Sequence, residues 1–297
     1  MNILLTGGTG LIGNALTRAL IDKGYKVRIL TRETDVEAPF YTWNSNTIDE
    51  KVFEDLDGII HLAGAPLMHK WTKKYKQQII DSRVNTAQLL YKYITKKNIQ
   101  LKFFISASGS SFYGQTTSNK IYTEADPIGN DFLADVCDKW ENAAHQFKTN
   151  AQKIVCIRTP LVLAKEAESF KLMKFPTALG FGSCLGNGQQ WTTWIHINDL
   201  CRIYIEAIEN NLLVNAINAV ATEQLSHQHF MQSLAKALHK PLWLPNIPSF
   251  LVKLAMGEKA TLILDGSRLS NQKLKDCDFK FEFDSLNDTW NDFFNKN

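Results

Sequence analysis

The first residues whose types and spacing could do chemistry are the glycines of TGGTGLIG, near the amino terminus. Gly7, Gly10 and Gly13 have GxxGxxG spacing, between an apolar run at 2–6 and a helical run at 13–24. Glycines so placed permit a sharp exit from a strand, a close approach of ligand to backbone, and tight packing of the helix. The N–H groups and positive dipole of the first helical turn then attract phosphate oxygens. The pattern predicts a site for a dinucleotide's pyrophosphate.

The residue after the second apolar run indicates which dinucleotide binds. NAD sites typically carry an acidic residue about 20 positions after the glycines, where it meets the ribose 2′-OH. Here the run at 26–31 is followed by Arg32, whose guanidinium suits the 2′-phosphate of NADP. Glu33 is the competing candidate, because it would serve NAD if the strand ended one residue later. We expect NADP, with NAD the less favoured cofactor.

The elements that must position these residues follow from the hydrophobic pattern. Short β-branched or apolar runs alternate with helical stretches over roughly the first 160 residues. This alternation predicts an α/β fold with right-handed crossovers and a doubly wound parallel Rossmann-type sheet. The expected strands lie at 2–6, 26–31, 57–64, 102–108 and 153–159, and the expected helices at 13–24, 75–94 and 135–147.

The alternation of strand-like and helical runs ends after Pro160, which indicates a second unit. Residues 164–193 hold several glycines and prolines, and 194–208 then reads as a strand-like turn followed by a helix. We expect an NADP-binding Rossmann-type domain over 1–163. We expect a small α/β lobe on the substrate side over 164–297, with 194–220 returning to the Rossmann sheet.

Composition narrows the class of protein. The 297 residues are 44% hydrophobic and 21% charged, and a net charge of +3 does not favour a nucleic acid or membrane partner. No apolar run reaches the ~18 residues of a membrane span. Five cysteines without a CxxC pair indicate reduced thiols and a cytoplasmic location, and the scattered histidines give no metal site. The expected partner is a small-molecule substrate, and nothing argues for an oligomer.

Four segments together resemble the extended short-chain dehydrogenase/reductases: GGTGLIG, DGIIHLAGAPL, SASGSSFYG and GQQWTTWIHINDL. More narrowly, they are similar to the atypical epimerase-family branch represented by YfcH-like proteins. The late segments INAVAT, HFMQSLAKALHKP and MGEKATLILDGSRLSNQKL resemble that branch's C-terminal region. The resemblance implies a Rossmann-type domain with a small C-terminal lobe and NADP binding. It does not imply a particular reaction.

The resemblance also assigns residues by position. It places the cofactor against Gly7, Gly10, Leu11, Ile12, Gly13, Arg32, Ala63 and Gly64. Asn85 matches the asparagine that supports the active-site helix in the larger family. Ser108 matches the active-site serine, and an extra residue before the YG pair makes Ser106 its rival beside the cofactor.

The chain departs from the larger family at the YxxxK pair. In that pair a tyrosine exchanges a proton with the substrate, and a lysine on the same helical face lowers the tyrosine pKa and holds the ribose. Aligning Glu141 of FLADVCDKWE puts Leu133 at the tyrosine position and Cys137 at the lysine position. Neither side chain performs these roles. An enzyme would therefore need a relocated acid or base, from Ser108, Tyr113 or Cys137, with Tyr113 the first to test.

Two functions remain open from the sequence. The favoured one is an NADP-dependent oxidoreductase or epimerase that acts at a hydroxyl or carbonyl carbon of a small, sugar-like molecule. The alternative is a catalytically silent NADP-binding sensor or scaffold, which loss of the YxxxK pair would predict.

The expected substrate-side residues come mostly from one segment, and are Gln190, Trp191, Trp194 and His196. Trp and Gln suit a flat or sugar-like ligand through stacking and hydrogen bonds. Trp194 and His196 have a second interpretation, in which they lock the two lobes together. Trp71 is a further substrate candidate. Asp199 is expected to cap the helix that follows it.

Overall fold

Seven parallel strands form the central sheet of the structure, a computed structural model that describes residues 1–295. Their order across the sheet is β11-β7-β5-β4-β1-β2-β3. In chain order they are β1 (Asn2–Thr6), β2 (Lys26–Thr31), β3 (Phe40–Thr42), β4 (Gly58–His61), β5 (Phe103–Gly109), β7 (Ile154–Thr159) and β11 (Asn215–Asn218). The predicted doubly wound α/β fold is confirmed.

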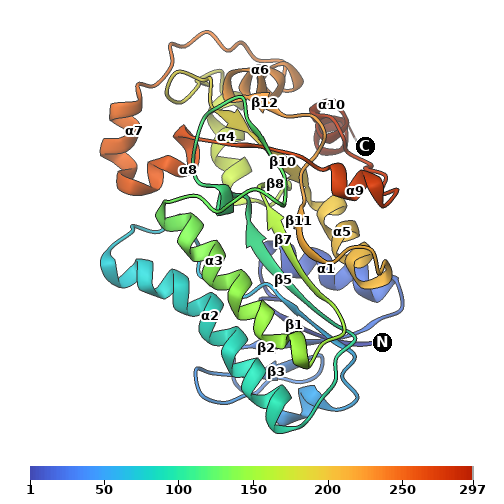
Figure 1. Cartoon of the computed structure of the whole chain (residues 1–297). Helices are drawn as coiled ribbons and strands as arrows, with labels where there is room; N and C mark the ends of the chain where they lie inside the picture. Colours follow the sequence, from blue (N-terminus) through green and yellow to red (C-terminus); the bar gives the residue numbers. More distant parts are fainter. Residues whose placement is uncertain (296–297) are drawn as a thin grey trace.

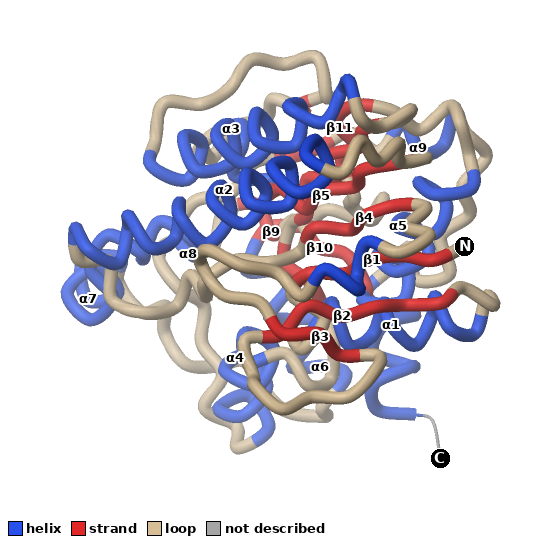
Figure 2. Tube along the Cα trace, turned by 90° about the horizontal axis from the view of Figure 1, so that it is seen from below, coloured by secondary structure: helices blue, strands red, loops and turns tan. Residues whose placement is uncertain are grey.

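Helices cover both faces of this sheet. Helices α1 (Leu11–Asp22) and α5 (Ile197–Glu209) lie on one face, and α2 (Lys73–Lys96) and α3 (Phe132–His145) lie on the other (Figure 2). Because helices cover both faces, β4 and the first six residues of β5 are wholly buried. Strands buried in this way read as nearly continuous apolar runs in the sequence.

The strand order reverses between β1 and β4. From β1 the chain moves outward to β2 and β3, and then crosses back to β4 on the other side of β1. In open sheets of this kind ligands bind at the carboxyl ends of the strands beside such a reversal. The TGGTGLIG loop leaves β1 at this place.

The later half of the chain contributes to both parts of the molecule. After α5 it returns to the sheet as β11, whose residues 215–218 pair in parallel with residues 155–158 of β7. The remaining elements form a second lobe, which lies above the carboxyl edge of the sheet in Figure 1.

Three two-stranded sheets support this second lobe. They pair β8 (Leu161–Leu163) with β10 (Trp194–His196), β9 (Trp191–Thr192) with β12 (Leu225–Ser226), and β6 (Ile121–Tyr122) with β13 (Arg268–Leu269). Its helices are α4 (Glu168–Ala178), α6 (His227–Ala237), α7 (Ser249–Met256), α8 (Thr261–Leu264) and α10 (Leu286–Trp290). Helix α9 (Gln272–Asp276) packs beside β11 of the central sheet instead. Trp194, Phe170 and Phe230 are completely or almost completely buried in the core of the second lobe.

The longest helix, α2, has 24 residues, and it is amphipathic: buried positions such as Ile79 and Leu90 alternate with exposed polar ones. Among residues 1–295, no helix is both long enough and apolar enough to cross a membrane.

Candidate functional site

Two glycines of the loop after β1 are required by the fold itself. Gly7 has a φ of +71°, and a Cβ there would lie 2.8 Å from the carbonyl carbon of Leu62. A Cβ on Gly13 would collide with the Gly7 carbonyl oxygen and the Gly8 backbone. The loop therefore packs directly on the exit of β4, and α1 packs directly on the loop.

Gly10 differs, because nothing in the protein requires it to be glycine. Its φ of −80° and ψ of 176° are open to any residue, and the nearest atom to an added Cβ is the Gly7 oxygen at 3.4 Å. No side chain caps the first turn of α1. A helix start without a side-chain cap presents free N–H groups to an anion. A side chain at Gly10 would fill the space over these groups, so the loop fits a diphosphate.

A buried network joins the end of β1 to the end of β4. Thr6 Oγ1 lies 2.8 Å from His61 Nδ1, and His61 Nε2 donates to the Arg83 carbonyl oxygen at 2.9 Å. The Ala63 N–H donates to Thr6 Oγ1 at 3.2 Å. Burial lowers the pKa of His61 to about 4. His61 is thus neutral, accepts a hydrogen bond from the Thr6 hydroxyl at Nδ1, and fixes both strand ends beside the glycine loop.

Arg32 lies directly after β2, the strand next to β1. Its side chain is exposed, and it makes no ion pair or hydrogen bond with any residue in the described range 1–295. Glu33 is also exposed, and its N–H donates to Thr31 Oγ1. Both side chains are free to meet an adenosine ribose, so their assignment to NADP or NAD stays a prediction.

Arg83, a residue of α2, holds the loop after β4 in place. The guanidinium donates to the Ala65 and Ile79 carbonyl oxygens and lies 4.8 Å from the centre of the Trp140 ring. A Cβ on Gly64 would lie 2.8 Å from Arg83 Cζ. Glycine is therefore needed here because Arg83 already fills the space. Ala63 precedes it and is largely buried.

The other cofactor candidates differ in accessibility. Leu11 is exposed at the head of α1, and Ile12 is half-buried against the core. Ser106 is completely buried, and its hydroxyl donates to the Ala107 carbonyl oxygen at 2.9 Å. Leu11 is thus open to a ligand, whereas Ser106 is not.

Ser108 and Tyr113 belong to a buried polar network. Ser108 Oγ donates to Glu141 Oε1 at 2.6 Å, and Arg158 binds both oxygens of Glu141 at 2.8 and 2.9 Å. Arg158 also donates to Tyr113 Oη, which in turn donates to Asn218 Oδ1 at 2.7 Å. Burial raises the pKa of Tyr113 to about 12. The Tyr113 hydroxyl is thus enclosed and already hydrogen-bonded to Arg158 and Asn218, which argues against the expectation that it supplies relocated acid–base chemistry.

The remaining catalytic candidates do not form a common site either. Asn85 is exposed on α2, and its amide makes no hydrogen bond within residues 1–295, so it does not join Ser108. Leu133 and Cys137 are buried. Cys137 Sγ lies 3.6 Å from the Gly109 carbonyl oxygen, and burial raises the thiol pKa to about 12, which keeps it protonated and unreactive.

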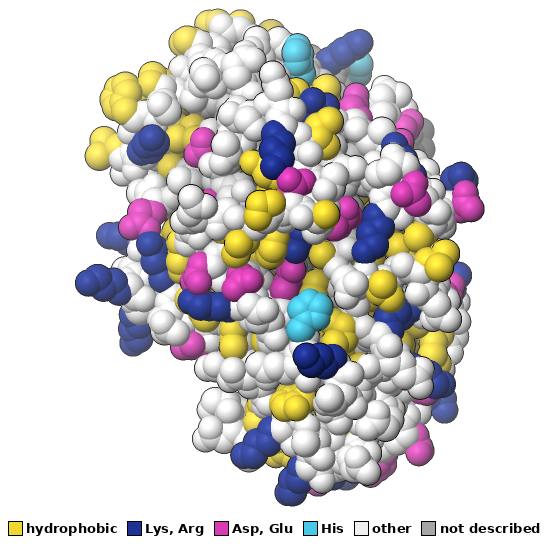
Figure 3. Space-filling model, viewed as in Figure 1, with side chains coloured by type: hydrophobic (Ala, Val, Ile, Leu, Met, Phe, Trp, Pro, Cys, Tyr) yellow, Lys and Arg dark blue, Asp and Glu magenta, His cyan; other side chains and the backbone are white. Residues whose placement is uncertain are grey.

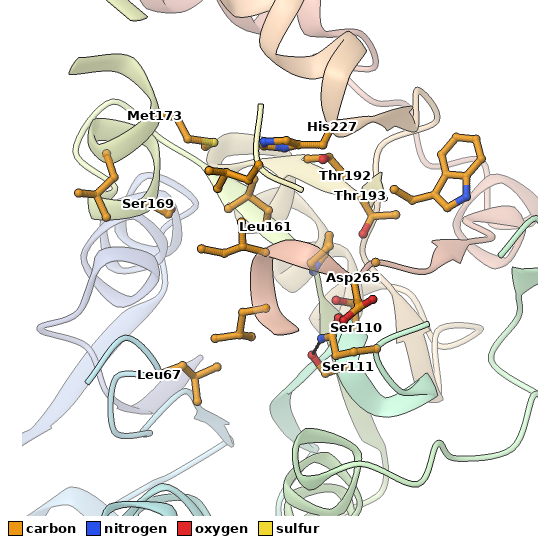
Figure 4. Close-up of a pocket in the computed structure, with 18 of the residues that line it drawn as sticks. Leu67, Ser110, Ser111, Leu161, Ser169, Met173, Thr192, Thr193, His227 and Asp265 are labelled. Carbon is orange, nitrogen blue, oxygen red and sulfur yellow. Dashed lines mark hydrogen bonds between the residues drawn. The ribbon is translucent and has the colours of Figure 1, made fainter. Parts of the chain in front are cut away.

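A cavity of about 630 Å³ lies between the carboxyl edge of the sheet and the second lobe (Figure 4). On the sheet side its wall is formed by Gly109, the last residue of β5, by Ser110 and Ser111, which directly follow it, and by residues 159–162. On the lobe side the wall comes from α4, α6, and residues 262–267. The cavity and the glycine loop thus open at the same edge of the sheet.

The polar side chains of the cavity lining are mainly serines and threonines, together with Gln115, Asp265 and His227. Asp265 lies beside Ser110 and Ser111 in Figure 4, and makes no ion pair or side-chain hydrogen bond within the described chain. Burial raises its pKa. His227 is only 5% exposed, and its Nε2 has no hydrogen-bond partner among residues 1–295. Burial lowers the pKa of His227 to about 4, so the ring is neutral.

Sequence reasoning missed these four cavity residues for different reasons. Ser110 and Ser111 lie inside the quoted SASGSSFYG motif but were passed over for Ser108. Asp265 lies in MGEKATLILDGSRLSNQKL, which was used only for the resemblance. His227 is one of the scattered histidines, whose spacing indicates no metal site. An isolated Asp or His carries no spacing signal, so only the tertiary structure could place them.

The predicted substrate residues require correction. Gln190 and Trp194 are buried and do not line the cavity, and neither does Trp71. Gln190 Nε2 donates to two backbone carbonyl oxygens of the lobe, and Trp71 Nε1 donates to the Leu67 carbonyl oxygen. Trp191 does line the cavity. Gln190, Trp194 and Trp71 therefore do not contact the interior of the cavity.

His196 and Asp199 fix the C-terminal segment. His196 does not line the cavity: its ring stacks on Phe283 at 3.8 Å, and its Nδ1 accepts from the Asn198 N–H at the start of α5. Asp199 is not the cap that was expected. It is completely buried and accepts from the N–H groups of Glu282 and Phe283. The geometry supports the packing interpretation of His196.

Comparison with known proteins gives two profile matches. The NAD dependent epimerase/dehydratase family matches residues 3–134, and a domain of unknown function, DUF1731, matches residues 247–292. Epimerase family protein SAR0825 of Staphylococcus aureus is 32% identical over 300 residues, which cover 99% of each chain. The similarity therefore runs the whole length of both proteins.

Solved structures show the same fold. Human epimerase family protein SDR39U1, solved with NADPH, superposes with a TM-score of 0.88 at 28% identity and covers 100% of each chain. UDP-glucuronic acid 4-epimerase from Bacillus cereus, solved with UDP-glucuronic acid and NAD, gives a TM-score of 0.75 at 22% identity. The match covers 99% of this chain and 98% of that one. This second likeness shows a shared fold alone.

Proposed function

We propose a function from the premise that this chain belongs to the epimerase family. The function is NADP-dependent oxidation, reduction or epimerisation at a carbon that bears a hydroxyl or carbonyl group. One observation carries the proposal: the glycine loop after β1 and the cavity at residues 109–111 open at the same carboxyl edge of the sheet. In doubly wound folds the reacting end of a dinucleotide lies at this edge.

NADPH is the proposed cofactor. The space over Gly10 and the free N–H groups of α1 would hold the diphosphate, and the unpaired Arg32 guanidinium would hold the 2′-phosphate. The human relative solved with NADPH supports this choice. NAD is the competing cofactor through Glu33.

Asp265 is the proposed proton donor. NADPH, when bound, supplies a hydride to a carbonyl carbon. Asp265 would give its proton to the carbonyl oxygen of the substrate, and solvent would then return a proton to the carboxylate. Burial raises the pKa of Asp265, which favours the protonated form that a donor needs.

Ser111 would orient the same carbonyl oxygen. Its Oγ accepts a hydrogen bond from Gln115 Nε2 at 2.7 Å, which leaves the hydroxyl proton free to point at a ligand. Asp265 lies within the region matched by the domain of unknown function, so that region would supply both a wall of the cavity and the acid.

The test is NADPH consumption with a panel of aldehydes and ketones, after binding of NADPH has been measured by calorimetry. The proposal expects at least one compound to oxidise NADPH above the blank rate. Binding of NADPH with no oxidation across the panel would overturn the catalytic proposal.

The second candidate function is a cofactor-dependent sensor or scaffold. It is favoured by one specific observation, the burial of Leu133 and Cys137 at the positions of the lost YxxxK pair. This candidate expects NADPH binding without turnover, which the same experiment measures.

A further inference from the structure

Most of the accessible lining of the cavity is apolar, and its polar side chains are mainly uncharged serines and threonines. Its lobe-side wall includes Leu161, Leu172, Met173, Leu185, Met231 and Ile263. Among the described residues that line it, none is Lys or Arg, and the one charged type is the carboxylic acid of Asp265. A nucleoside diphosphate would bring two negative charges into this space with no cationic side chain in the lining to balance them.

The first turn of α6 also reaches the cavity, but its N–H groups are already used. The His227 N–H donates to the Gln190 carbonyl oxygen, and the Gln228 N–H donates to the Gly188 carbonyl oxygen. Ser226 Oγ accepts from the His229 N–H. This helix start therefore offers no free donors to a phosphate group.

We propose that the cavity binds an uncharged, mainly apolar carbonyl compound or alcohol, and that His227 Nε2 recognises a neutral hydrogen-bonding group on it. The proposal rests on the proposed function only for the reacting end of the ligand, which lies at Asp265. Figure 4 shows His227 and Asp265 on separate sides of the cavity, so a ligand would span the space between them.

The proposal explains why the buried Nε2 atom of His227 has no hydrogen-bond partner among the described residues. An imidazole nitrogen buried without a partner costs stability, and a ligand that hydrogen-bonds to it removes this cost. The ring is neutral, because burial lowers its pKa. A neutral ring selects a hydroxyl or amide over a carboxylate or phosphate.

The entrance to the cavity is apolar as well. Leu172, Phe181 and Ile247 line it and are 57%, 62% and 40% exposed. Ile247 leads into α7, where Phe250 and Leu254 are 66% and 82% exposed, and Figure 3 shows hydrophobic side chains gathered over this helix. Apolar side chains therefore continue from the surface into the cavity, as an apolar ligand requires.

The test measures ligand binding to protein saturated with NADP⁺, whose own binding is measured first. The probes are 2-alkanones of about six to twelve carbons, the same ketones with a terminal hydroxyl, and UDP-glucose. We expect the ketones to bind at least about tenfold more tightly than UDP-glucose, and the best hydroxyketone to bind about three- to tenfold more tightly than its parent. Tighter binding of UDP-glucose, or no binding of any ketone, would overturn the proposal.

Two variants separate the cavity from general effects. His227→Leu should abolish the preference for the terminal hydroxyl and keep binding of the parent ketone, whereas His229→Leu, on the exposed side of α6, should keep the preference. Leu172→Glu should weaken all ketones at least about tenfold, whereas Leu212→Glu, at a still more exposed leucine outside the cavity, should not. Equal effects of variant and control would contradict the assignment.

Failure of this proposal differs from failure of the proposed function. If NADP⁺ and NADPH do not bind, the proposed function fails, and the same probes added to cofactor-free protein still test the cavity. If the cofactor binds and UDP-glucose is preferred over every ketone, only the ligand class is wrong.

Discussion

Ser108 and Glu141 are joined by a hydrogen bond of 2.6 Å that ties the end of β5 to the middle of α3. The same carboxylate is held by Arg158, so the serine faces a paired ion and not a substrate. The helix that carries YxxxK in related enzymes has here become part of a buried structural network. Ser108 is therefore not free to exchange a proton with a substrate, and the proposed acid, Asp265, lies on the cavity wall and not on α3.

Tyr113→Phe tests this relocation. The change removes the hydroxyl that links Arg158 to Asn218, and we expect the free energy of unfolding to fall by about 1 kcal/mol. NADPH oxidation by the best substrate should fall less than about threefold, because Tyr113 does not line the cavity. Urea unfolding and steady-state kinetics measure the two effects. A thousandfold loss of kcat in a stable variant would restore Tyr113 as the acid.

Asp265→Asn should remove turnover and keep the fold. The amide has nearly the same shape but is not a proton donor of similar strength, so we expect kcat to fall by about 10²–10⁴. The Kd of NADPH should be unchanged. Asp278→Asn, at an exposed aspartate on the surface, is the matched control. If both variants keep full activity, another group supplies the proton.

Arg32→Ala should weaken NADPH more than NADH, because only NADPH carries the 2′-phosphate. Loss of a charge-assisted contact costs about 1.5–3 kcal/mol, or about 10- to 150-fold in Kd. Titration of both coenzymes against both proteins measures the difference. Equal changes for the two coenzymes would show that Arg32 does not contact the phosphate.

Because its pKa is lowered in the folded protein, His61 should make the free energy of unfolding fall between pH 7 and pH 5. Its pKa is about 4 in the folded protein, against about 6.5 when unfolded, so below pH 6.5 the unfolded chain binds a proton that the folded chain does not. Its stabilising contribution is complete above pH 6.5 and is lost as the pH falls towards 4, by about 2 kcal/mol between pH 7 and pH 5.

Urea unfolding of the wild type and His61→Gln at the two pH values checks this contribution. His196 and His227 have pKa values lowered in the same direction, so the wild-type loss includes them. The variant should lose about 2 kcal/mol less than the wild type. An identical loss in both proteins would contradict the neutral, buried state of His61.

The sequence predicts local features well and long-range ones poorly. The glycine loop and the strands at 2–6 and 26–31 lie where the pattern places them, because periodicity and glycine spacing act over a few residues. Strand β3 was not predicted, since three half-exposed residues after Pro39 carry too short a pattern. The prediction also began α3 three residues late, at 135 instead of 132.

The site was harder to predict than the fold for the same physical reason. Tyr113 and Asn218 are 105 positions apart, and Ser108 and Glu141 are 33 apart, yet each pair shares a hydrogen bond. No local pattern records such contacts. Asp265 reaches the cavity only because β13 pairs with β6 and brings its segment beside the end of β5.

The most direct measurement is calorimetric titration of NADPH into the wild type and Gly10→Val. The backbone at Gly10 suits any residue and an added Cβ meets only the Gly7 oxygen, at 3.4 Å, so we expect the unfolding free energy to fall by no more than about 1 kcal/mol, as for a poor N-cap. Its side chain should nevertheless block the diphosphate. The account predicts one NADPH per wild-type chain and at least about hundredfold weaker binding by the variant. Absence of binding to the folded wild type, or equal affinity of both proteins, would contradict it.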